Sequence, residues 1–172
     1  MSIFKFMGPA TLLAASLCGC NQMTTEPPTN PGRLLVGDEI RLVTDGKSLN
    51  GQRVSIDGYA LFCSLNGMYR SGNVVDIEIH ATRDCRSRTI AAAKVRLLRE
   101  SAASPGLMAS GVRPRNAVLI GDIFSNEHVK FLTDDYTVLP PKGVVRVSGV
   151  VNYQSDRAGS PELEGISLHG LN

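Results

Sequence analysis

Two stretches, residues 52–62 (QRVSIDGYALF) and residues 143–153 (GVVRVSGVVNY), decide how this chain folds. In each, valine or isoleucine alternates with polar residues, and a period of two is typical of a β-strand with one buried face. Each also contains an interior glycine, Gly58 or Gly149. A glycine inside a strand indicates a bulge or a sharp bend, which a small barrel needs where a strand turns a corner. The two stretches therefore predict long, bent strands.

Three further segments extend this β pattern. Residues 74–80 (VVDIEIH) alternate apolar and polar side chains, as a half-buried strand should. Residues 117–124 (AVLIGDIF) and residues 163–169 (LEGISLH) also look like strands. Glycine, asparagine and serine between residues 64 and 73 supply turn residues between the strands predicted over residues 52–62 and 74–80. We expect five or so strands in all.

The spacing of apolar residues changes over residues 86–103. Ile90, Ala93 and Leu97 fall at helical intervals among good helix formers, which predicts one helix here. Val95 and Leu97 also alternate, so a strand over residues 94–98 is the competing interpretation. The next residues, 104–114, contain two prolines and two glycines and are expected to form a loop.

Length and composition bound the class of protein. A chain of 172 residues with 42% hydrophobic and 20% charged residues fits one small globular domain plus a short appendage. This excludes a large multidomain enzyme. The composition is neither disordered nor fibrous, and 17 glycines agree with turn-rich β structure.

The first twenty residues carry an export signal. Lys5 precedes an apolar run over residues 6–17, and small residues and cysteine follow it. The run contains Gly8 and Pro9 and is too short to span a bilayer stably. No other window of the sequence has the eighteen or so continuous apolar residues that a transmembrane helix needs.

The end of this leader, Leu17-Cys18-Gly19-Cys20, resembles the lipobox of bacterial lipoproteins. The resemblance implies cleavage after Gly19, a diacylglyceryl group on the Cys20 thiol and acylation of the new α-amino group. Two or three acyl chains hold a protein on a membrane essentially permanently. Asn21 follows the anchor where an inner-membrane retention signal would have Asp, so the resemblance implies the periplasmic side of the outer membrane, or the cell membrane in a Gram-positive cell. The alternative is an ordinary signal peptide with a coincidental cysteine.

The chain then divides into three parts: a signal peptide over residues 1–19, a lipidated tether over residues 20–32 and one folded domain over residues 33–172. The tether contains Pro27, Pro28 and Pro31 and lacks apolar periodicity. Loss of residues 1–19 removes Lys5 alone among the charged residues, and the formal charge falls from +2 to +1. A net charge this close to zero gives the whole molecule no electrostatic attraction to nucleic acid or to a membrane surface.

Two cysteines are left for the folded domain, Cys63 and Cys85. In an oxidising compartment such a pair predicts one disulfide, with an entropic stabilisation of about 3 kcal/mol. Two buried free thiols or a redox pair are the alternatives, although C-x-x-C spacing is absent. The histidines do not follow the spacing of a metal site, so we expect neither a metal nor another cofactor.

The five strands, their interior glycines and a helix after about the third strand resemble an OB-fold, a small Greek-key barrel. Residues 48–62 (SLNGQRVSIDGYALF) also resemble the opening of small secreted OB-like domains. The resemblance implies a mainly β domain with one helix, built as a five-stranded, partly open barrel. A small β-sandwich or an α+β domain is the alternative.

OB-folds often bind oligonucleotides or oligosaccharides, and this chain has a stretch of basic residues that is a candidate patch for an anionic partner. Oligonucleotide-binding domains of this class also use stacking aromatic residues. The seven aromatic residues after the leader mostly fall where strands would bury them. We therefore expect no nucleic-acid binding, and the competing interpretation of the basic stretch is a solvated face. The patch residues are Arg83, Arg86, Arg88, Lys94, Arg96 and Arg99.

Catalysis has little support in the sequence. None of the common nucleophile, zinc-protease or phosphate-loop motifs occurs. His80 lies on the polar face of its predicted strand and is expected at the surface rather than as a base. We expect a non-catalytic binding or structural module, with an envelope protein as partner, in the manner of an accessory subunit of a cell-envelope or secretion assembly. The alternative is an extracytoplasmic hydrolase of cell-wall or small-molecule substrates.

Overall fold

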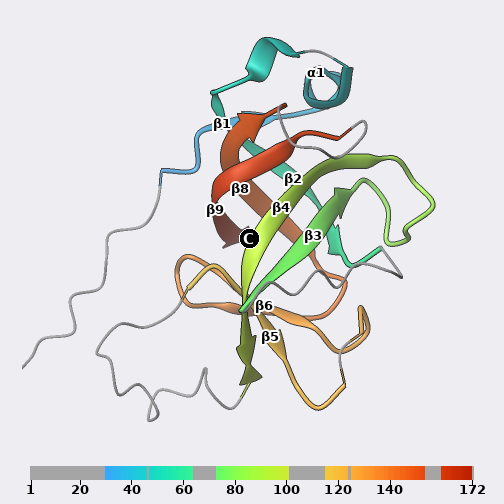
Figure 1. Ribbon diagram of the computed structural model, residues 1–172, viewed down its shortest axis with the longest axis vertical. Helices are drawn as coiled ribbons and strands as arrows, with labels where there is room; N and C mark the ends of the chain where they lie inside the picture. Colours follow the sequence, from blue (N-terminus) through green and yellow to red (C-terminus); the bar gives the residue numbers. More distant parts are fainter. Residues whose placement is uncertain are drawn as a thin grey trace, which may run out of the picture.

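The structure is a computed structural model that describes residues 30–45, 47–63, 73–100, 115–123, 125–153 and 160–171. These residues are mainly β, with one short α-helix and one 3₁₀ turn (Figure 1). The elements are β1 (Arg33–Leu35), α1 (Glu39–Asp45), η1 (Lys47–Leu49), β2 (Arg53–Leu61), β3 (Val74–His80), β4 (Thr89–Arg99), β5 (Ala117–Ile120), β6 (Lys130–Leu132), β7 (Val138–Leu139), β8 (Val144–Asn152) and β9 (Glu162–Gly170).

Five of these strands close into a barrel. β2 pairs with β3 and β8, β3 pairs with β4, and β9 joins β4 to β8. The seam between β4 and β9 is parallel and short, with Ala92 opposite Glu162 and Ala93 opposite Leu163, whereas the other four pairs are antiparallel. This ring confirms the predicted OB-like five-stranded barrel, and its hydrogen-bonded circuit is closed.

The two interior glycines lie where the prediction requires bends. β2 pairs with β8 through Tyr59 and then with β3 from Tyr59 onward, so the strand leaves one partner for the other beside Gly58. A Cβ at Gly58 would lie 2.8 Å from the backbone oxygen of His80. Gly149 lies at a register shift between β8 and β9, where a Cβ would approach the Cβ of Leu163 to 2.9 Å. Both positions therefore require glycine because neighbouring strands pass too close for a side chain.

The barrel interior is filled with aliphatic side chains. Ile56, Ile77, Val147 and Leu168 are fully buried in one cluster, and Phe131 from β6 packs into the same cluster. Each such side chain contributes about 1.5–3 kcal/mol through burial. The interior of the described barrel is therefore an apolar core.

The helix predicted over residues 86–103 is wrong, because residues 89–99 form β4. The first half of β4, residues 90–93, is buried on both faces, which hides the period of two. Its second half alternates as the competing strand interpretation predicts, with Val95 buried and Lys94 and Arg96 exposed. Pairing with β3, β5 and β9 overrides the helix propensity of the alanines.

The α-helix found in the described residues lies before the barrel instead. α1 has seven residues, of which only Val43 is buried, so it is too short for a periodic apolar pattern to reveal it.

Three short strands, β5 to β7, continue from the end of β4 in the connection to β8 (Figure 1). The strand predicted over residues 117–124 is observed over its first four residues. Within the described residues, no helix has the length and apolar character that crossing a membrane requires.

Candidate functional site

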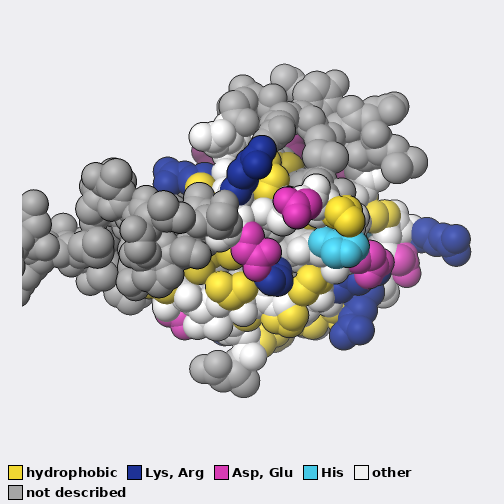
Figure 2. All heavy atoms as spheres, turned by 90° about the horizontal axis from the view of Figure 1, so that it is seen from below, with side chains coloured by type: hydrophobic (Ala, Val, Ile, Leu, Met, Phe, Trp, Pro, Cys, Tyr) yellow, Lys and Arg dark blue, Asp and Glu magenta, His cyan; other side chains and the backbone are white. Residues whose placement is uncertain are grey.

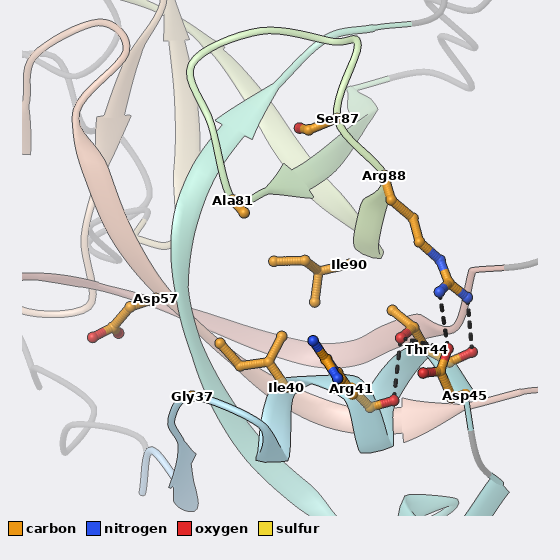
Figure 3. Close-up of a pocket in the computed structure, with 10 residues that line it drawn as sticks. All are labelled: Gly37, Ile40, Arg41, Thr44, Asp45, Asp57, Ala81, Ser87, Arg88 and Ile90. Carbon is orange, nitrogen blue, oxygen red and sulfur yellow. Dashed lines mark hydrogen bonds and ion pairs between the residues drawn. The ribbon is translucent and has the colours of Figure 1, made fainter.

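A groove of about 750 Å³ lies between α1 and the connection from β3 to β4, residues 81–88 (Figure 3). Ile40, Ala81 and Ile90 give it apolar walls, and Arg41 and Arg88 bring guanidinium groups to it. The full lining is Gly37, Ile40, Arg41, Thr44, Asp45, Asp57, Ala81, Ser87, Arg88 and Ile90.

α1 is held against the barrel so that it forms one wall of this groove. Val43 is buried in the core, and Ile40 packs against that core. The Tyr153 hydroxyl donates to the carbonyl oxygens of Leu42 and Val43, at 3.0 and 2.9 Å. Burial raises the pKa of Tyr153, which keeps the phenol protonated as a donor. These contacts compensate for the low intrinsic stability of a seven-residue helix.

One ion pair joins the two walls of the groove. Arg88 Nη1 lies 2.9 Å from Asp45 Oδ1. A hydrogen bond from the Thr44 hydroxyl, followed by contact with Arg88, lowers the pKa of Asp45, so this carboxyl group stays ionised. Arg41 lies 3.9 Å from Asp38, which immediately precedes α1. Exposed pairs of this kind contribute about 1 kcal/mol or less, so these arginines can exchange partners at low cost.

A disulfide fixes the opposite wall. Cys63 follows β2 and is bonded to Cys85 in the β3–β4 connection, with their Cα atoms 5.3 Å apart. This confirms the predicted pairing. Asp84 supports the same loop by accepting hydrogen bonds from the backbone N–H groups of Arg86 and Ser87. The groove is therefore preformed on its loop side.

His80 lies beneath this loop, at the end of β3. The expectation that it is a surface residue is wrong, because its exposed fraction is 1%. Ring atom Nδ1 lies 3.1 Å from both the backbone oxygen and the hydroxyl of Ser87. Ring atom Nε2 lies 3.2 Å from Cys63 Sγ and 3.2 Å from Glu78 Oε2. Position 80 falls on the polar face of the alternating strand pattern, but the loop held by the disulfide covers that position.

The structure does not bring the six predicted patch residues into one cluster. Arg83, Arg86 and Arg88 lie in the β3–β4 connection, whereas Lys94, Arg96 and Arg99 follow one another along β4. Arg83 stacks over the Tyr59 ring at 5.5 Å, and Lys94 pairs with Glu162 at 2.6 Å. On the face seen in Figure 2, Lys and Arg side chains are interspersed with Asp and Glu. Of the six patch residues, Arg88 lines the groove, together with Arg41, which was not part of the predicted patch.

Sequence reasoning missed the groove and the histidine cluster. Both combine residues that are far apart in the chain, and the only available signal was the predicted disulfide, which places the β3–β4 connection next to the end of β2. Cys20, the predicted lipidation site, and most of the predicted tether lie outside the described residues. No protein-family model, curated protein or solved structure matches this chain.

Proposed function

We propose that this protein is a lipid-anchored, non-catalytic binding module of the cell envelope, and that its groove takes a segment of a partner protein. The observation that carries this proposal is the preformed groove between α1 and the disulfide-stapled loop. Its occupant carries an acidic side chain beside an aliphatic one.

The architecture supports binding on the outside of the barrel. The described barrel interior is lined by buried aliphatic side chains, and protein cores of this kind are close-packed. α1 and the 81–88 loop are additions to the outside of the five-stranded ring, and together they create the groove. A wall held by a disulfide loses little conformational entropy when a partner binds, which favours affinity.

The chemistry of the groove supports the stated occupant. Ile40 and Ile90 can bury an aliphatic side chain, because both line the hollow. Arg41 and Arg88 are exposed guanidinium groups, and each can form a paired hydrogen bond to a carboxylate. Asp57, the acidic lining residue on β2, is already held by Arg146. Asp45, the other acidic lining residue, pairs with Arg88, so a carboxylate that binds the groove exchanges with Asp45 at Arg88 and with Asp38 at Arg41.

The lipid anchor is the second part of this proposal. Cys20 would carry the acyl chains, and Asn21 directs the protein to the outer membrane by analogy with bacterial lipoproteins. A dozen tether residues span on the order of 20–35 Å, enough to lift the barrel clear of the lipid headgroups. The Cys20→Ala variant should lose its lipid and leave the membrane fraction. Unchanged fractionation of that variant would refute the anchor.

A charge-reversal comparison tests the groove. The full chain, solubilised from envelopes, should recover its partner in a fixed ratio, and Arg41→Glu with Arg88→Glu should lower that recovery at least tenfold. The matched control is Arg96→Glu with Arg99→Glu, which makes the same charge change along β4 and should leave recovery unchanged. Equal loss in both variants would show that only overall charge matters, and no loss in either would refute the groove as the binding site. Thermal unfolding of each variant checks its fold.

A further inference from the structure

Three side chains with metal-binding atoms meet beside the disulfide. Cys63 Sγ, Glu78 Oε2 and His80 Nε2 come from the end of β2 and from β3, and their ligand atoms lie within 4.8 Å of one another. Cys85 Sγ is at the same place because it is bonded to Cys63 Sγ. The cluster thus holds two sulfur atoms, one imidazole and one carboxylate, and neither the barrel core nor the groove function requires that combination.

We propose that this cluster, once its disulfide is reduced, binds one divalent cation of the zinc class through Cys63, Cys85, His80 and Glu78. Two thiolates, an imidazole nitrogen and a carboxylate oxygen are donors that zinc takes in four-coordinate sites. The disulfide blocks the site in the oxidised protein, since a thiolate rather than a disulfide sulfur is the metal ligand. This proposal does not depend on the partner-binding function.

Two of the separations between donor atoms are close to those of a tetrahedral centre. Zinc–ligand bonds of about 2.0–2.3 Å place neighbouring donors about 3.3–3.8 Å apart. His80 Nε2 already lies 3.2 Å from Cys63 Sγ and 3.2 Å from Glu78 Oε2. The two cysteine Cα atoms are 5.3 Å apart, so side-chain rotation can separate the free sulfurs to the required edge length. Small movements therefore convert the cluster into a coordination sphere.

Hydrogen bonds from residues outside the cluster orient two of the proposed ligands. In known metal sites, a ligating histidine donates its other N–H to a carbonyl or carboxylate in the same way. His80 Nδ1 faces the backbone oxygen of Ser87 at 3.1 Å, which leaves Nε2 directed at the cluster. Thr89 donates its hydroxyl hydrogen to Glu78 Oε2 at 2.8 Å. Two of the proposed ligands are thus held in place from outside the cluster.

The reaction that opens the site balances with a dithiol as reductant. The dithiol reduces the Cys63–Cys85 bond to two cysteine thiols, and it is itself oxidised to a disulfide. Binding of the cation then displaces the two thiol protons. Cys85 is exposed, so a reductant can reach the bond, whereas His80 is buried and keeps the donor set in place.

Cobalt titration tests the proposal. The full chain carrying Cys18→Ser and Cys20→Ser leaves Cys63 and Cys85 as its only cysteines. After reduction and removal of the reductant without oxygen, Co²⁺ should bind one per chain, with a thiolate-to-cobalt charge-transfer band and the visible absorption of a tetrahedral centre, and Zn²⁺ should displace it. The reoxidised protein should bind at least 100-fold more weakly. Equal binding by both forms, or none by the reduced form, would overturn the proposal.

A carboxylate variant separates this site from chance binding to thiols. Glu78→Gln keeps an oxygen that can accept from Thr89, and it should weaken cobalt binding by the reduced chain at least tenfold. The matched control is Glu164→Gln on β9, which makes the same change away from the cluster and should leave binding unchanged. Equal affinity in the two variants would exclude Glu78 as a ligand and contradict the four-residue site. Circular dichroism of both variants checks that the barrel is intact.

Discussion

Asp57 and Arg146 face each other across the β2–β8 ladder, where the two carboxylate oxygens accept hydrogen bonds from Arg146 Nε and Nη2 at 2.7 and 2.9 Å. The hydrogen bond to Asp57 raises the pKa of Arg146 further. The pair is about one-third exposed, with side-chain fractions of 33% and 32%. It ties together two barrel strands that are 89 residues apart in the chain, directly beside the groove.

Removing this pair should cost modest stability. Asp57→Asn should lower the free energy of unfolding by about 1 kcal/mol, since a cross-strand ion pair contributes roughly 0.2–1 kcal/mol and Arg146 would lose its partner. A double-mutant cycle with Arg146→Gln, measured by urea unfolding, should give a coupling energy of about 0.5–1 kcal/mol. Additive effects of the two substitutions would show that the two side chains do not interact in solution.

A side chain at Gly58 should strain the barrel corner. The Cβ of Gly58→Ala would lie 2.8 Å from the His80 backbone oxygen, and overpacking of this kind costs about 1–3 kcal/mol. Thermal unfolding should show the loss. Gly121→Ala is the control, because its Cβ would meet only Glu100 Oε2 at 3.7 Å, and it should be near neutral. Equal stability of the two variants would contradict the close approach of β2 and β3.

Loss of the disulfide should destabilise the domain. Cys63 and Cys85 are separated by 22 residues, and a bond that closes a loop of this length contributes about 3 kcal/mol through the unfolded chain. Replacing both cysteines by serine should lower the urea midpoint by the corresponding amount, without added metal. Reductant should shift the wild-type midpoint in the same direction and leave the variant unchanged. A reductant effect on the variant would point to another cause.

His169 should contribute to acid sensitivity. Burial lowers the pKa of His169 below its usual value near 6.5, although Asp134 opposes this shift. The unfolded chain therefore binds more protons than the folded one as the pH falls below about 6.5, and stability decreases in that direction. His169→Asn should unfold with a weaker pH dependence there. His128→Asn, which alters an exposed histidine, is the control, and equal slopes in the two variants would remove His169 as a contributor.

β2 and β8 could be predicted from sequence because each has one buried face and a glycine where neighbouring strands crowd it. The first half of β4 could not, since residues 90–93 are buried on both faces and give no alternation. α1 was missed because one buried side chain in seven residues leaves no periodic signal. Local pattern therefore identified strands with distinct faces and missed elements whose burial depends on distant partners.

The candidate site, like the fold, could be predicted from sequence only in part. Cys63 and Cys85 could be paired by counting cysteines, because the predicted signal peptide would remove Cys18 and the predicted lipidation would use Cys20. The burial of His80 could not be predicted, since it depends on the loop that the disulfide folds over the strand. The groove combines residues 37–45 with residues 81–90 and Asp57, and no local pattern connects these segments.

Site-specific photo-crosslinking in intact cells tests the central claim most directly. A photoreactive residue placed in the full chain at Ala81, which lines the groove, should yield one discrete adduct with a partner protein. The same residue at Val138, whose exposed fraction is 49% and which does not line the groove, should yield none. Arg41→Glu with Arg88→Glu should abolish the Ala81 adduct. The absence of any adduct at Ala81, or the same partner captured equally from Val138, would contradict a groove that binds a partner protein.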